Sequence, residues 1–295
     1  MSLSPAIFGK SFEDSSSPLV QELFDVLGEN SDKIYVFENF IPFLEKRINL
    51  PNNVSGFNSH KTLAEVKPDF LLSVGGDGTI LNAVTYIRDS GIPILGINLG
   101  RLGFLSNVPK NEVKEAVSEL VAGKYDIEKR TLLCVDTDEG LFDDLNFALN
   151  ELTVHKKDSS SMITINAYIN DEYLNSYWAD GLIVSTPTGS TAYSLSCGGP
   201  ILGPNSQNIV ITPIAPHNLN VRPIVLSDDV KLKLKVEGRS NELLVSLDSR
   251  SETVDSSVEL KISKCKFQIQ LIELNNQSFF KTIRQKLLWG SDKRN

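Results

Sequence analysis

Hydrophobic residues in the first 125 positions follow two alternating spacings. Short apolar runs of strand length lie at 6–8, 33–37, 70–74 and 94–98. Between these runs, apolar side chains recur every three or four residues, which predicts helices over 17–28, 40–48, 79–88 and 111–122. We expect a polar, turn-rich loop from Pro51 to Lys61. Strands that alternate with helices predict a parallel, Rossmann-like sheet covered on both faces.

After about Tyr125, the apolar positions no longer recur every three or four residues but every second residue. Alternation at 163–169, 230–236 and 267–271 is typical of strands with one buried face. Helical spacing returns from Ser278 to Trp289. The pattern predicts an α/β nucleotide-binding domain at 1–126, an all-β domain at 127–277, and a C-terminal helix at 278–295 that packs back on the first domain.

The run Gly75-Gly76-Asp77-Gly78-Thr79 lies between a predicted strand and a predicted helix. Adjacent glycines let the backbone approach a ligand, and the N–H groups at a helix start attract phosphate. A carboxylate in such a turn would repel phosphate, so Asp77 needs a reason to be there. It is either the N-cap of the helix or a base that takes the proton of a phosphoryl acceptor, with a divalent metal offsetting the charge.

A second run, from Asp180-Gly181 to Thr186-Pro187-Thr188-Gly189-Ser190-Thr191-Ala192-Tyr193-Ser194, concentrates hydroxyl groups and glycines inside the β region. Hydroxyls offer donors and acceptors at short reach, and the Tyr193 ring offers a flat face for a base. The alternative is an ordinary loop rich in serine and threonine. The residues of this run do not by themselves decide between the two.

Composition limits the classes of partner. The net charge of −8 argues against a general binder of nucleic acid or anionic membrane, and no apolar stretch is long enough to cross a bilayer. Three scattered histidines lack zinc spacing, so we expect no resident metal site. Cys134, Cys197 and Cys265 are far apart, which is typical of a cytoplasmic protein without a disulfide framework.

Four motifs in order resemble the NAD kinase family over nearly the whole chain. They are Gly75-Gly76-Asp77-Gly78-Thr79, Leu99-Gly100-Arg101-Leu102-Gly103-Phe104-Leu105, Asn150-Glu151, and the run that follows Asp180-Gly181. The first motif is shared with phosphofructokinases and with diacylglycerol and sphingosine kinases, whereas the last is specific. The resemblance implies transfer of the ATP γ-phosphate to the adenosine-ribose 2′-hydroxyl of NAD, with Mg²⁺ and in a homodimer or homotetramer.

The resemblance also assigns roles by position. Asp77 matches the general base, in a phosphate-facing turn made by Gly75, Gly76, Gly78 and Thr79. Asn150 and Glu151 match residues that hold the NAD ribose, and Asp180 matches a residue near the nicotinamide. The remaining matches belong to the adenine pocket: Thr191, Ala192, Tyr193, Ser194, Ser196 and Ala215.

Two positions depart from the family pattern. Asn82 and Trp178 stand where the family often has basic residues, so phosphate binding would need other cations, for which Lys10 and Arg101 are candidates. Two other functions stay open at this point. One is a lipid kinase of the diacylglycerol kinase type, and the other is a non-catalytic sensor that binds a dinucleotide.

Overall fold

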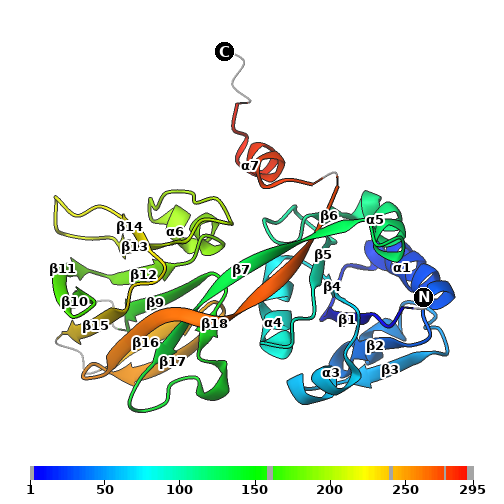
Figure 1. Ribbon diagram of the computed structural model, residues 1–295, viewed down its shortest axis with the longest axis horizontal. Helices are drawn as coiled ribbons and strands as arrows, with labels where there is room; N and C mark the ends of the chain where they lie inside the picture. Colours follow the sequence, from blue (N-terminus) through cyan, green and yellow to red (C-terminus); the bar gives the residue numbers. More distant parts are fainter. Residues whose placement is uncertain (1–2, 158–161, 239–241, 276, 291–295) are drawn as a thin grey trace. The chain divides into compact units, whose positions relative to one another are not determined.

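The computed structural model describes residues 3–157, 162–238, 242–275 and 277–290 (Figure 1). The chain forms two compact units, of which the first comprises Met1–Lys129 with Ile269–Asn295 and the second Arg130–Gln268. The domain boundaries predicted from the sequence lie at 126/127 and 277/278. The boundaries of the two units fall inside two long strands, β7 (Tyr125–Asp136) and β18 (Glu259–Leu274), which pair with each other.

The first unit is built on a parallel sheet in the order β5-β4-β1-β2-β3. Its strands are β1 (Ala6–Gly9), β2 (Ile34–Phe37), β3 (Val54–Phe57), β4 (Leu71–Val74) and β5 (Ile94–Asn98), with the short β6 (Val108–Pro109) on β5. The helices are α1 (Ser17–Asn30), α2 (Ile41–Leu44), α3 (His60–Val66), α4 (Asp77–Ile87) and α5 (Val113–Val121). Every residue of β1, β4 and β5 is buried, because helices cover both faces of the sheet.

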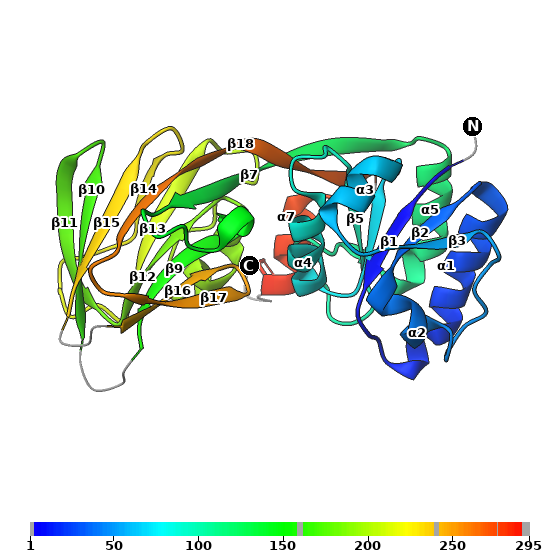
Figure 2. The same cartoon turned by 90° about the horizontal axis from the view of Figure 1, so that it is seen from below.

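The helices pack in pairs on the two faces of the sheet. In Figure 2, α1 and α5 pack together on one face of this sheet, and α3 and α4 pack together on the other. The chain steps from β1 to β2 in one direction and from β4 to β5 in the other, so the strand order reverses between β1 and β4. The carboxyl ends of strands at such a point are the usual ligand site of an open α/β sheet. The Gly75–Thr79 run lies there, directly after β4.

Three expectations for this unit need correction. The predicted loop from Pro51 to Lys61 contains β3 and the start of α3. The strand was missed because β3 is an edge strand, half-exposed, with serine and glycine in place of alternating apolar residues. Helix α1 continues past Gly28 to Asn30, and the helix predicted at 40–48 is the four-residue α2.

The second unit is antiparallel, as expected for an all-β domain. One set of strands pairs in the order β14-β13-β12-β9-β16-β17, and another in the order β11-β10-β15-β18, while β8 pairs with β7. The bounds are β8 (Phe147–Ala148), β9 (Glu151–Lys156), β10 (Ile163–Ile169), β11 (Glu172–Ala179), β12 (Gly181–Ser185), β13 (Asn208–Ile214), β14 (Ile224–Ser227), β15 (Leu232–Glu237), β16 (Glu242–Leu247) and β17 (Arg250–Asp255). Alternating apolar residues of both sets, such as Ile165, Leu234, Val184 and Val245, form one core.

The C-terminal helix α7 (Phe279–Leu287) belongs to the first unit, which confirms the expectation that it packs back there. The Ser278 hydroxyl caps this helix by accepting the Lys281 N–H at 3.2 Å. The Phe279 ring lies 6.4 Å from the Phe104 ring, so the helix is anchored on the loop after β5. Within the described residues, none of the helices is long and apolar enough to span a membrane.

The cysteines differ from expectation. Cys134 in β7 and Cys265 in β18 form a disulfide, with their Cα atoms 5.1 Å apart although 131 positions separate them in sequence. The prediction of no disulfide was wrong because it relied on the separation of the cysteines in sequence, whereas the pairing of β7 with β18 brings these two positions together. Cys197 is free.

Candidate active site

The turn between β4 and α4 is shaped by Gly75. Its N–H donates to the Ile97 carbonyl at 2.9 Å and its φ is +154°, a conformation that residues with a side chain rarely adopt. A Cβ at this position would overlap the Thr79 hydroxyl. A Cβ at Gly76 or Gly78 would meet no atom within 4 Å. The backbone of these two glycines therefore faces open space beside the start of α4.

The Asp77 carboxylate is held by the loop that follows β5. Its Oδ2 accepts the Phe104 N–H at 2.8 Å, and its Oδ1 accepts the N–H groups of Leu105 at 3.1 Å and Ser106 at 2.8 Å. The Ser106 hydroxyl donates to the Gly75 carbonyl at 3.1 Å, which ties the same loop to the turn. Asp77 does not cap α4, whose N-cap is Gly76 without a side-chain hydrogen bond. The capping interpretation is wrong, and the structural role of Asp77 is to fix the loop.

Sequence reasoning missed a cation at this carboxylate. The Lys286 ammonium, on α7, lies 3.8 Å from Asp77 Oδ2 and 4.7 Å from the centre of the Phe104 ring. Lys10 and Arg101, the cations expected from the sequence, are exposed. Helical spacing could have found Lys286, because it follows the buried Ile283 by three positions and so lies on the same face of α7.

In the second unit, Asn150 and Glu151 are positioned through their backbone. Asp248, at the turn between β16 and β17, has a buried side chain that accepts the N–H groups of Leu149 at 2.9 Å, Asn150 at 2.8 Å and Glu151 at 3.2 Å. The Arg250 guanidinium lies 4.0 Å from Asp248 Oδ2, which compensates the buried charge. Asp248 is a positioning residue that no sequence motif indicated.

Glu151 lies in an environment that disfavours its charge. Burial, reinforced by the nearby Asp248, raises the pKa of Glu151 from 4.5 to about 8, although a backbone hydrogen bond from Tyr193 acts in the other direction. Its Oε2 is buried and has no hydrogen-bond partner among the described residues. A neutral carboxyl at physiological pH can both donate and accept a hydrogen bond, as the vicinal hydroxyls of a ribose require.

The hydroxyl-rich run packs directly on Asn150. A Cβ at Gly189 would overlap the Asn150 backbone, so only glycine allows this approach. The Thr186 N–H donates to the Asn150 carbonyl at 2.9 Å, and its hydroxyl donates to the Leu149 carbonyl at 2.6 Å. The run therefore serves partly as structure: its hydroxyls fix the 149–151 segment.

Several predicted adenine-pocket residues lie together after β12. Gly189–Thr191 forms a 3-10 turn, and Tyr193–Ser196 forms the short helix α6. Ser194 is buried, with its hydroxyl 2.8 Å from that of Thr212, while Ala192 is half-buried and Ser196 is exposed. The Thr191 hydroxyl donates to the Thr188 carbonyl at 3.2 Å. Tyr193 is an exposed residue, at 41% of its full accessibility, so a ligand can reach it.

Asp180 and Ala215 lie at one end of β12 and β13. The Lys156 ammonium lies 2.5 Å from Asp180 Oδ1. Asp180 also contributes to the raised pKa of Tyr193, although burial and the Cys197 thiol contribute more, so these side chains are neighbours. Ala215 is exposed with a φ of +44°, directly after β13. Trp178 is half-exposed, and its ring lies 5.1 Å from that of His217.

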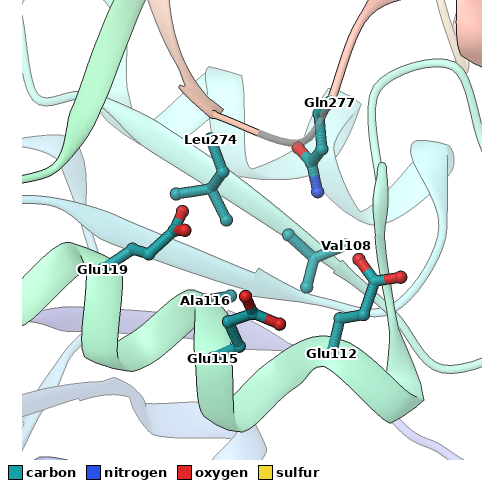
Figure 3. Close-up of a pocket in the computed structure, with 7 residues that line it drawn as sticks. All are labelled: Val108, Glu112, Glu115, Ala116, Glu119, Leu274 and Gln277. Carbon is teal, nitrogen blue, oxygen red and sulfur yellow. The ribbon is translucent and has the colours of Figure 1, made fainter.

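A pocket of the first unit does not belong to this site. Figure 3 shows it lined by Glu112, Glu115 and Glu119 of one face of α5 and its preceding turn, with Val108, Ala116, Leu274 and Gln277. Three carboxylates would repel a nucleotide phosphate, and none of the predicted site residues lines it. Within the described part of the chain, no three His, Cys, Asp or Glu residues form a group that could hold a metal.

Comparison with known proteins matches both parts of the chain to one family. Residues 6–125 match the ATP-NAD kinase N-terminal domain, and residues 149–274 match the ATP-NAD kinase C-terminal domain. An NAD kinase of Cytophaga hutchinsonii is 50% identical over 291 residues, and one of Flavobacterium psychrophilum is 52% identical over 293 residues. Each alignment covers 98% of this chain and 99% of the relative.

Two solved structures share the fold. The crystal structure of yeast NADH kinase complexed with NADH gives a TM-score of 0.84 at 26% identity and covers 98% of this chain and 89% of its own. The structure of an NAD kinase from Archaeoglobus fulgidus in complex with ATP gives a TM-score of 0.72 at 26% identity and covers 97% of this chain and 99% of its own. This chain belongs to the ATP-NAD kinase family.

Proposed function

We propose that Asp77 is the general base of the reaction that this NAD kinase catalyses, the transfer of the ATP γ-phosphate to the 2′-hydroxyl of the adenosine ribose of NAD. One observation carries the assignment. An ionised carboxylate has about four lone-pair sites, and the backbone N–H groups of the 104–106 loop use one on Oδ2 and two on Oδ1. Oδ2 keeps a lone pair that can accept a proton from the 2′-hydroxyl, on a side chain that is already oriented.

For NAD we propose the second unit as the binding region. Asn150 and Glu151 would hold the ribose hydroxyls, because the amide and the neutral carboxyl between them donate and accept hydrogen bonds. Asp180, paired with Lys156, would lie near the nicotinamide end. Residues 191–196 and Ala215 would bind the adenine, with the exposed Tyr193 stacking on the base.

For ATP we propose binding of the phosphates at the Gly75–Thr79 turn. The open space over Gly76 and Gly78 and the N–H groups at the start of α4 suit an anion. We propose that the divalent metal arrives as the Mg²⁺ complex of ATP, since Mg²⁺ is usually held by substrate phosphates with one or two carboxylates. Its chemistry there would be to offset negative charge on the phosphates.

The active form of the protein, we propose, is a homodimer or homotetramer built through the β domain. In the described part of the chain, its edge strands β11, β14 and β17 each pair with a neighbour on one side only. A cytoplasmic location stays a prediction. The Cys134–Cys265 disulfide bears on it, because such bonds are uncommon in the reducing cytosol.

The direct test is to incubate the protein with Mg²⁺, ATP and NAD and to assay NADP with an NADP-specific dehydrogenase. We expect NADP in one-to-one yield with ADP. A sensor would bind NAD without forming either product, and a lipid kinase would form ADP only when diacylglycerol replaces NAD. The relatives and solved structures above are NAD or NADH kinases, which favours the first outcome.

A further inference from the structure

We propose that Lys286 binds the γ-phosphate of ATP during its transfer and stabilises the charge that develops on it. The inference rests on the proposed function, in which Asp77 accepts the proton of the 2′-hydroxyl. It adds a residue from the C-terminal helix α7, more than 200 positions away in the chain, to the residues that touch the reacting atoms.

The distance between Lys286 and Asp77 leaves both groups usable. At 3.8 Å, the ammonium and Oδ2 are beyond hydrogen-bond length, so they do not hydrogen-bond to each other and both can bind a ligand. The two side chains are 35% and 29% exposed, so a ligand can reach them. A phosphoryl oxygen can accept from the ammonium while Oδ2 accepts the hydroxyl proton on its remaining lone pair.

Phe104 fixes both partners. Its N–H donates to Asp77 Oδ2 at 2.8 Å, and the centre of its ring lies 4.7 Å from the Lys286 ammonium. A cation over an aromatic face is held by the ring quadrupole. One residue of the loop thus orients the carboxylate through its backbone and the ammonium through its side chain.

Helix α7 presents Lys286 to this loop for a reason that the sequence contains. Phe279, Ile283 and Lys286 recur at positions i, i+4 and i+7, which lie on one face of a helix. Ile283 is buried, and the Phe279 ring contacts that of Phe104. The same face that anchors the helix therefore directs Lys286 toward Phe104 and Asp77.

The chemistry requires a cation at this place. The ribose 2′-oxygen forms a bond to the γ-phosphorus, and the bond from that phosphorus to the β,γ-bridging oxygen breaks. The electron pair of the broken bond stays on ADP, and the hydroxyl proton passes to Asp77. Negative charge is spread over the transferred phosphoryl oxygens beside a carboxylate, so a lysine point charge lowers the barrier.

Three other residues, Asn82, Lys10 and Arg101, do not supply this cation. Asn82 is neutral, and its side-chain amide donates to the Gly78 carbonyl at 2.6 Å within α4. Lys10 and Arg101 are exposed, and neither forms an ion pair with Asp77 in the part of the chain that is described. Lys286 forms an ion pair with Asp77, and its ammonium is therefore a cation placed beside the reacting groups.

The test compares Lys286→Met, Lys286→Arg and the control Arg284→Met, which removes a positive charge from the exposed face of the same helix. We expect Lys286→Met to lower kcat/KM for ATP by about 10- to 100-fold, as for loss of a charge-assisted hydrogen bond, and Lys286→Arg to recover most of it. Arg284→Met should stay within about twofold of wild type, as for most exposed substitutions.

Calorimetry with the Mg²⁺ complexes of ADP and of β,γ-imido-ATP gives a second readout that a purely structural role would not move. Lys286→Met should lower the affinity for the imido analogue and leave the affinity for ADP unchanged, because only the analogue carries the γ-phosphate. An equal loss of affinity for both ligands, or a kcat/KM indistinguishable from that of Arg284→Met, would overturn the proposal. A wild-type protein that forms no NADP would refute the proposed function instead, and the two binding measurements would still decide the role of Lys286.

Discussion

A methyl group at Gly103 would overlap Asp77 Oδ1, the atom that accepts the N–H groups of Leu105 and Ser106. Gly103→Ala therefore has to push the carboxylate off its donors while leaving it in the protein. We predict a lower kcat, by about tenfold, because misplacing a reacting group by even 1 Å is costly. Steady-state kinetics would measure this, with Gly203→Ala as the control, because Gly203 is exposed and a Cβ there would meet no atom within 4 Å; equal kcat values for both variants would contradict the prediction.

Glu151→Gln should change how stability depends on pH. The pKa of Glu151 is raised to about 8 in the folded chain from 4.5 in the unfolded chain, mainly by burial. Between these values the folded state binds more protons, so the free energy of unfolding falls as pH rises; below 4.5 the contribution of the neutral carboxyl is complete. Glutamine does not titrate, so the free energy of unfolding of the variant should fall less steeply as pH rises.

Urea unfolding of both proteins between pH 5 and pH 8 measures these slopes. Asp171→Asn serves as the control, because Asp171 is an exposed surface carboxylate. Parallel curves for wild type and Glu151→Gln would show that Glu151 titrates normally in the folded protein.

Tyr193→Ala should raise the KM for NAD and change kcat less. Tyr193 is 41% exposed, and stacking on a base contributes about 1–3 kcal/mol. Tyr173→Ala removes another exposed tyrosine, from β11 of the same unit, and should leave the KM unchanged. If the KM for NAD is the same in wild type and Tyr193→Ala, the ring does not contact the adenine.

Assembly gives a further prediction. We expect a homodimer or homotetramer built through the β domain, because pairing between subunits covers edge strands. Light scattering at micromolar concentration measures the mass. A monomer with full activity under the same conditions would exclude assembly as a requirement for function.

Much of the fold could be predicted from the sequence because the strands of the parallel sheet are continuous apolar runs and the helices are amphipathic. The strand β3 could not, since an edge strand with Ser55 and Gly56 has no apolar periodicity. The disulfide could not either, because only the pairing of β7 with β18 brings Cys134 near Cys265.

The candidate site could be predicted where its residues form local motifs. Asp77, Asn150 and Glu151 stand in short runs with special turn chemistry, and the structure gives each a constrained environment. Asp248 and Lys286 lie 97 and 209 positions from the residues they support, Glu151 and Asp77, in segments without a motif. The tertiary fold sets spatial neighbours of that kind: helical spacing places Lys286 on the same face of α7 as Ile283, but only the fold brings that face to Asp77.

The central claim is that Asp77 accepts a proton, and the structure offers a specific competing explanation. Asp77 also fixes the 104–106 loop, and asparagine would offer one acceptor oxygen and turn an N–H₂ toward a backbone donor. Asp77→Asn therefore removes the base and disturbs the loop. Gly103→Ala disturbs the same loop and keeps the base, so the two variants separate the roles.

The most direct measurement is kcat for Asp77→Asn, with calorimetric affinities for ATP and NAD on the same preparation and Gly103→Ala alongside. We predict a kcat lower by about 10²- to 10⁴-fold, as for loss of a general base, with both affinities kept and ATP binding unchanged or tighter. A kcat above about a tenth of wild type, or one no lower than that of Gly103→Ala, would contradict the account and leave Asp77 as a residue that fixes the loop.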